Sequence, residues 1–241
     1  SGRLELDFKV TGQLDKPAVF GRATVQNADV QLAAFPYPVT DIQGAITFSE
    51  QRVVFERFSA RALGGSVNLQ GAAALAGRGF GSYRLEVGAE RLSLTPKEGI
   101  ELTFGGKGEL AWKRGERLPK LGGTLRLDRM RYTRAISMGR TLGDFKKKQR
   151  VDVEAYDPDA DLLALDLRVV QGEPVHVQNN LVDAQIHIDD TKEPFRLLGT
   201  DQRFGVLGNM SIRRGTVRLR DTAFDIRAGE INFDSAVRIE P

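Results

Sequence analysis

The sequence predicts an all-β fold of many short, mostly antiparallel strands. The main observation is alternation, because successive side chains of a strand point to opposite faces of the sheet. More than a dozen segments place apolar residues at every second position, among them those around Ile46, Leu165 and Ile186. Almost no segment has helical spacing, and one-sided strands of this kind are typical of antiparallel sheets.

The stretch 209–233 repeats every seven residues, a period that could indicate a coiled coil. Its apolar residues, however, are spaced two and then five apart, and residues two apart share a face in a strand but not in a helix. Charged residues and glycines fill the gaps at 213–215, 220–222 and 227–229, where we expect tight bends. The stretch therefore predicts four short strands with one apolar face. The apolar pairs are Met210 and Ile212, Val217 and Leu219, Phe224 and Ile226, and Ile231 and Phe233.

Degenerate internal repeats support an elongated sheet. Segments 21–30, 123–132 and 208–217 each begin with Gly, place an aliphatic residue four positions later and end in Val or Tyr. The first and the third are followed by Gly-x-Ile-x-Phe, at 44–48 and 229–233. Because repeated strand units stack side by side, we expect a single elongated β domain over residues 1–241.

The segment 133–149 departs from the strand pattern. Ala135, Met138, Leu142 and Phe145 are three or four residues apart, which predicts one short amphipathic helix. The surrounding stretch 126–150 contains nine Lys or Arg against two Asp. Such a basic face is either simply solvated or in contact with anionic lipid headgroups. It has too few aromatic residues for a nucleic-acid surface. The candidate headgroup contacts are Arg131, Arg134, Lys146, Lys147 and Lys148.

The residues that most catalytic sites require are scarce. The chain has no cysteine and two histidines, so disulfides and thiolate metal sites are excluded. No nucleophile elbow or phosphate loop is present, and we expect no enzyme activity, no cofactor and no metal. The segment 157–161 has the opening spacing of a calcium loop. It lacks that loop's later glycine and glutamate, so we interpret it as a solvated acidic turn.

The ends of the chain indicate a piece of a longer protein. Its first two residues, Ser1 and Gly2, resemble a cloning remnant, and no signal-peptide pattern follows them. No apolar run approaches the roughly 18 residues that are needed to cross a bilayer. The net charge of +3 is compatible with anionic partners but does not identify one.

Two stretches resemble known families. Residues 41–71 are similar to the repeating unit of the AsmA-like superfamily: a Gly-x-Ile-x-Phe strand, a short apolar strand, a Gly-Gly bend and a strand that ends in Gly. The block 163–241 resembles the TamB C-terminal domain family through LDLRV, VHVQ and its closing glycine-led strands. The resemblance implies a curled, U-shaped sheet with an apolar inner groove.

The same resemblance implies a location and partners. It implies the periplasm of a Gram-negative bacterium, as part of an inner-membrane-anchored protein that supports outer-membrane biogenesis and protein secretion. The implied partners are phospholipid, conducted between the two membranes, and an outer-membrane barrel of the BamA family similar to TamA. Membrane contact would come from parts of the longer protein outside this chain.

The apolar faces allow two arrangements. They could pack together as an ordinary sandwich core. Alternatively, they could line a groove for acyl chains, whose burial contributes about 0.8 kcal/mol per methylene. A rival function is an assembly adaptor whose strand edges pair with a barrel or with a nascent outer-membrane protein. The predicted groove lining is Ile46, Phe48, Leu165, Leu167, Ile186, Ile188 and the eight apolar residues of 209–233.

Overall fold

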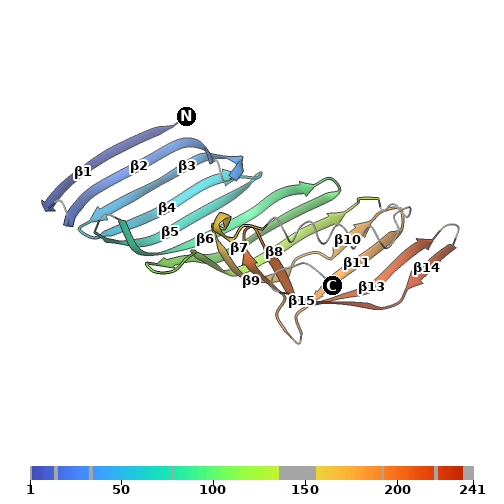
Figure 1. Cartoon of the computed structure of the whole chain (residues 1–241). Coiled ribbons are helices and arrows are strands. Elements are labelled where there is room, and N and C mark those ends of the chain that lie inside the picture. The colour runs from blue at the N-terminus through green and yellow to red at the C-terminus, as the bar shows by residue number, and fades with distance from the viewer. Residues whose placement is uncertain are drawn as a thin grey trace. The chain divides into compact units, whose positions relative to one another are not determined.

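The computed structural model describes residues 2–13, 16–32, 35–77, 79–135, 156–191, 193–219 and 222–235. It confirms the predicted all-β fold, because these residues form one large sheet of 15 mostly antiparallel strands (Figure 1). Within the described residues, the single helical element is a 3-10 turn at Pro158–Ala160. Several strands are much longer than the sequence predicted, and β6, Gly79–Lys97, alone has 19 residues.

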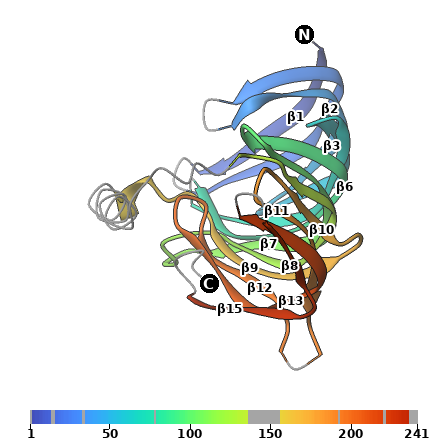
Figure 2. The same ribbon diagram turned by 90° about the vertical axis from the view of Figure 1, so that its right-hand side faces the viewer.

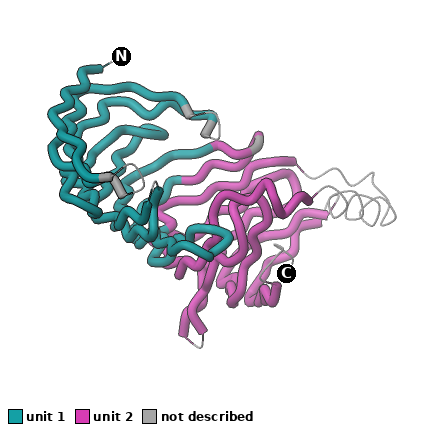
Figure 3. Tube along the Cα trace, turned by 60° about the vertical axis from the view of Figure 1, so that its left-hand side comes forward, with its two compact units in different colours: residues 1–94, 103–126 teal, residues 95–102, 127–241 magenta. Residues whose placement is uncertain are grey.

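Contacts within the chain divide it into two compact units (Figure 3). Unit 1 comprises Ser1–Leu94 and Thr103–Arg126, and unit 2 comprises Thr95–Leu102 and Leu127–Pro241. The residue boundaries of the units fall within the sixth, seventh and eighth strands, Gly79–Lys97, Ile100–Lys113 and Lys120–Tyr132.

In unit 1, strands that follow one another in the sequence are neighbours in the sheet. This meander needs no crossover connection, and β1 to β6 are joined by hydrogen bonds in antiparallel register. The strands are β1 Arg3–Gln13, β2 Lys16–Leu32, β3 Phe35–Ser49, β4 Arg52–Ala62, β5 Gly65–Ala76, most of β6 Gly79–Lys97, β7 Ile100–Lys113 and the first part of β8 Lys120–Tyr132.

Strands β2, β3 and β4 each contain a β-bulge. Asn27, Asp41 and Arg57 have left-handed backbones, with φ of 49°, 52° and 44°. Near each of them the pairing with a neighbouring strand shifts by one residue. Bulges bend strands, and Figure 2 shows β1 to β3 bowed along their length. Residues three apart in a regular strand point to opposite faces, but the extra residue of a bulge brings them to the same face. Phe55 and Phe58 therefore share a face, with their ring centroids 6.1 Å apart.

In unit 2, strand β13 is central, because its two edges pair with different strands. Residues 209–217 pair with β11 and residues 204–207 with β12, along one edge. Residues 206–212 pair with β15 and residues 215–219 with β14, along the other. The strands of unit 2 after β8 are β9 Ala164–Gln171, β10 Val175–Gln178, β11 Val182–Asp189, β12 Arg196–Thr200, β13 Phe204–Leu219, β14 Thr222–Ile226 and β15 Gly229–Ser235.

The prediction of four short strands in 209–233 was partly wrong. Met210, Ile212, Val217 and Leu219 all lie in one strand, β13, and the expected bend at 213–215 is absent. Ile212 pairs with Ile186 and Arg214 with Gln185, which leaves Arg213 as the extra residue of a bulge. The gaps at 219–222 and 226–229 do separate strands, as expected.

Strands β8 and β10 form a parallel pair in unit 2, with His176 beside Arg131. A parallel pair requires a long connection, and residues 133–174, which include β9, provide it. The predicted helix at 133–149 falls in this connection. Residues 133–135 are not helical, and the remainder of the predicted helix lies outside the described residues.

Candidate functional site

The apolar face of unit 1 is a set of rows that cross the strands. Directly paired residues share a face, so the register places Phe8, Gly21, Phe48, Val53, Ala73 and Tyr83 in one such row. The predicted residue Ile46 lies in the next row, between Ala23 and Phe55. Both Ile46 and Phe48 are half-buried.

The edge strand of this face is the most exposed. Leu4, Leu6, Phe8 and Val10 alternate along β1 and point to the apolar face, and each exposes between 55% and 60% of its surface. The residues that alternate with them, Arg3, Glu5, Asp7 and Lys9, are charged. Strand β1 therefore presents an uncovered apolar stripe on one side and a charged one on the other.

The structure brings the predicted residues of unit 2 onto one face. Ile188 pairs with Met210, which pairs with Ile231, and Val217 pairs with Phe224. Leu167 pairs with Leu197, and Leu197 with Val206, which continues the same face into β9. The bulge at Arg213 keeps the two halves of β13 in phase, so all eight apolar residues of 209–233 lie on this face.

These faces are not closed cores. Among the described residues, no large side chain is less than 2% exposed, and five of the twelve buried apolar residues are alanines. An ordinary sandwich core would bury its large side chains completely. Phe195, at 4% exposed, is the largest of the buried residues, and it packs over Gly208 and edge-on against Phe233.

The proposed headgroup residues are only partly described. Arg131 is exposed near the end of β8, opposite His176 of β10, and Arg134 is exposed just beyond this strand. Lys146, Lys147 and Lys148 lie outside the described residues. A role for any of the five in lipid contact stays a prediction.

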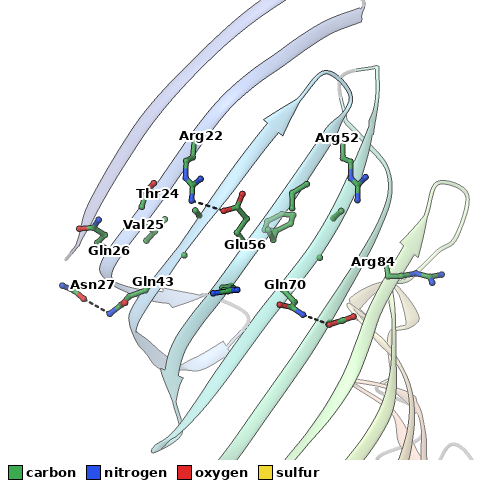
Figure 4. A pocket seen from close by; sticks show the side chains of 18 residues that line it. Arg22, Thr24, Val25, Gln26, Asn27, Gln43, Arg52, Glu56, Gln70 and Arg84 are labelled. Carbon is green, nitrogen blue, oxygen red and sulfur yellow. Dashed lines mark hydrogen bonds and ion pairs between the residues drawn. The ribbon is translucent and has the colours of Figure 1, made fainter.

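The polar face of unit 1 carries an open depression of about 1330 Å³ (Figure 4). Its polar side chains are largely paired with one another across strands. Arg22 forms an ion pair with Glu56 at 2.9 Å, and Gln70 donates to Glu86 at 2.7 Å. Alanines and glycines form the floor between these pairs. The depression is therefore best described as a solvated, internally paired surface.

A cluster of three aromatic residues on unit 1 was missed by the sequence reasoning. Tyr83 stacks on Trp112 with ring centroids 5.8 Å apart, and Phe80 packs edge-on against Tyr83 at 6.4 Å. Because Tyr83 belongs to the row that begins at Phe8, this aromatic cluster lies on the apolar face. The three residues come from two strands, so their spacing in the sequence gives no signal.

The segment 157–161 is not simply a solvated turn, which corrects the sequence interpretation. Asp157 caps the 3-10 turn, but Asp161 is only 5% exposed and accepts hydrogen bonds from the hydroxyls of Tyr156 and Thr200, both at 2.7 Å. Asp201 accepts from the amides of Leu162 and Leu163 at 2.9 and 3.0 Å. The residues just before β9 are thereby fixed to the turn between β12 and β13.

These bonds predict a pH dependence of stability. Burial alone raises the pKa of Asp201, but hydrogen bonds from Leu162, Gln202 and Leu163 outweigh it and hold the pKa below its usual value. A carboxyl group with a depressed pKa stabilises the fold at neutral pH, and this contribution is lost as the pH falls through the folded pKa. We expect thermal denaturation to show a smaller loss of stability below about pH 4 in Asp201→Asn than in the parent chain. Identical profiles would contradict the assignment.

Comparison with known proteins now identifies the family. Residues 56–241 match the family model of the TamB C-terminal domain. The chain belongs to the TamB C-terminal domain family. The match includes the block 163–241 that carried the resemblance and extends it back into β4 of unit 1. No curated protein and no solved structure gives a significant match.

TamB-family membership gives a general role. The family belongs to the Gram-negative envelope and serves outer-membrane assembly and lipid transport, together with the outer-membrane assembly machinery. Among the described residues of this TamB-family chain, no helix has the length and apolar character that a membrane span requires. The same residues contain no group of three or more His, Asp or Glu side chains placed to hold a metal ion.

Proposed function

We propose that this chain is a periplasmic segment of a bridge between the inner and outer membranes, and that it shelters and conducts phospholipid acyl chains along its apolar faces. The observation that supports the proposal most strongly is the uncovered stripe Leu4, Leu6, Phe8 and Val10 on β1. Large exposed apolar surfaces are unfavourable in water unless a ligand or partner covers them.

The chemistry of the faces suits acyl chains. Both units present rows of Leu, Ile, Val and Phe, with hydrogen-bonding and charged groups on the opposite face of the sheet. Each methylene that leaves water on such a surface contributes about 0.8 kcal/mol. Apolar contacts have no directional requirement. An acyl chain on these rows therefore forms no bonds of fixed geometry and can move along them.

Mass spectrometry of solvent extracts from the purified protein tests the proposal. We expect phospholipid in extracts of the parent chain and several-fold less in extracts of Phe8→Asp. Phe8 is 55% exposed, so its replacement should leave the fold intact, which circular dichroism checks. Thr11→Asp adds the same charge to the opposite face of β1 and serves as the matched control. Absence of lipid from all three samples would contradict the proposal.

The sheet edges favour a second candidate function, an assembly adaptor. Within the described residues, β1 pairs only with β2, so its other edge has unpaired backbone groups. Such an edge can accept an added strand from a barrel protein such as TamA or from a nascent outer-membrane protein. An adaptor would tolerate Phe8→Asp and would fail when proline occupies the unpaired edge of β1. A conduit would show the opposite sensitivities.

A further inference from the structure

Strands β9 and β10 of unit 2 are two parts of one interrupted strand. Only residues 172–174 separate them, and both strands pair with β8 on one side. On the other side β9 pairs with β12, and β10 pairs with β11. Because the pairing of β10 with β11 ends at Val175 and Ile186, the remaining residues of β11 have no backbone partner from β10.

The side chain of Gln171 fills this place beside β11. Its Nε2 donates to the carbonyl of Ile186, and its Oε1 accepts from the amide of Ile188, both at 3.0 Å. A glutamine amide offers the same donor and acceptor groups as a peptide unit. It therefore bonds with β11 as the backbone of a neighbouring strand would. Since Gln171 is the last residue of β9, these bonds join β9 directly to β11.

Gln171 occupies a position at which the alternation of β9 predicts an apolar residue. Leu167 and Val169 precede it at every second position, and Leu167 lies on the apolar face of unit 2. After the interruption, Val175 continues this face opposite Ile186. A polar group on such a face is unfavourable unless it is hydrogen-bonded. The two bonds with β11 explain how a half-buried glutamine is accommodated there.

The backbone just after Gln171 is anchored to β8. The amides of Gly172 and Glu173 donate to the carbonyls of Leu127 and Asp128, at 2.8 and 3.2 Å. A Cβ atom at position 172 would lie 3.2 Å from the Cα of Asp128, a tight contact that glycine avoids. The interrupted strand thus stays close to β8, and the Gln171 side chain spans the opposite side, toward β11.

We propose that Gln171 is a positioning residue for conduction along the apolar face of unit 2, an inference that rests on the proposed function. Its amide replaces the backbone that is missing at the interruption and thereby holds Ile186 and Ile188 in line with Leu167 and Val169. Without these bonds, a carbonyl and an amide of β11 would lose their partners, which is unfavourable in a partly buried place. Strand β11 would separate from β9, and the apolar face would be divided there.

Hydrogen exchange of single amides tests the bonds in the parent chain and two variants. Methionine is similar in shape to glutamine but cannot bond with the backbone in this way, whereas glutamate keeps the acceptor and loses the donor. We expect the amide of Ile188 to exchange about tenfold faster in Gln171→Met, and at about the parent rate in Gln171→Glu. By alternation the amide of His187 points toward β13, so it should stay protected in all three proteins.

A side chain that only filled space would give the opposite order. Gln171→Met would then keep the amide of Ile188 protected, and Gln171→Glu would expose it, because a carboxylate is unfavourable on an apolar face. That order, in variants that gel filtration and circular dichroism show to be folded, would overturn the proposal.

Transfer of phosphatidylglycerol from donor to acceptor vesicles tests the positioning role. Gln171→Met makes the face more apolar, so a face that needed only apolar character would transfer lipid at the parent rate or faster. We expect transfer by Gln171→Met to be several-fold slower. Gln178→Met makes the same change at the exposed end of β10 and is the matched control, expected to transfer at the parent rate.

Two outcomes of the transfer measurement separate this proposal from the proposed function. Transfer at the parent rate by folded Gln171→Met would overturn the positioning role and leave conduction intact. Absence of transfer by the parent chain would overturn the proposed function, and the positioning role with it.

Discussion

Replacing Ile212 by aspartate is expected to reduce phospholipid transfer between donor and acceptor vesicles by about tenfold or more, because an ionised carboxylate on an apolar surface costs several kcal/mol. Ile212 pairs with Ile186 on one side and with Gly229 on the other, in the middle of the apolar face of unit 2. Ile186→Asp should have the same effect, since its other partner is the buried Val175. Fluorescent lipid transfer measures both variants.

The matched control for this prediction is Gln185→Asp. Gln185 precedes Ile186 and points to the opposite, polar face, where its partners are His176 and Arg214. A carboxylate there gains a favourable neighbour and should leave transfer unchanged. Circular dichroism and gel filtration establish that each variant is folded. Transfer at the parent rate by folded Ile212→Asp would contradict conduction along this face.

Deletion of Arg213 is expected to lower the free energy of unfolding by about 3 kcal/mol, because it removes the bulge of β13. Without the extra residue, side chains after position 213 would point to the other face of the sheet. Val217 would then turn its side chain away from Val182 and Phe224, or the pairing with β11 and β14 would have to slip. Denaturation in urea, followed by circular dichroism, measures the loss.

Arg213→Ala separates the backbone effect from the side chain. Arg213 is exposed, and its replacement keeps the number of residues in β13. We expect its free energy of unfolding to stay within about 0.5 kcal/mol of the parent value. If the deletion were as stable as Arg213→Ala, the bulge would not be what keeps the two halves of the strand in phase.

The apolar alternation was sufficient to predict the class of fold and the facing of most side chains. Ile186, Ile188 and the eight residues of 209–233 share a face, as predicted. The alternation could not distinguish a bulge from a turn, because both interrupt the period of two by an odd number of residues. For that reason the gap between Ile212 and Val217 was interpreted as a bend, although β13 continues through it.

Features that depend on register were outside the reach of the sequence. Tyr83 and Trp112 are far apart in the chain and meet only because β6 and β7 are neighbours. Asp161 looked like part of a solvated acidic turn, and its burial depends on Thr200, which comes from β12. A pattern in one segment cannot show which other segment will cover it.

The meander of unit 1 has a consequence for how such a chain can lengthen during evolution. Because every strand pairs with its neighbours in the sequence, duplication of one hairpin adds two strands and changes no existing pair except at the point of insertion. Strands lie about 4.8 Å apart, so each added hairpin extends the apolar face by about 10 Å. The number of hairpins in the gene therefore sets the distance that a unit of this kind can span.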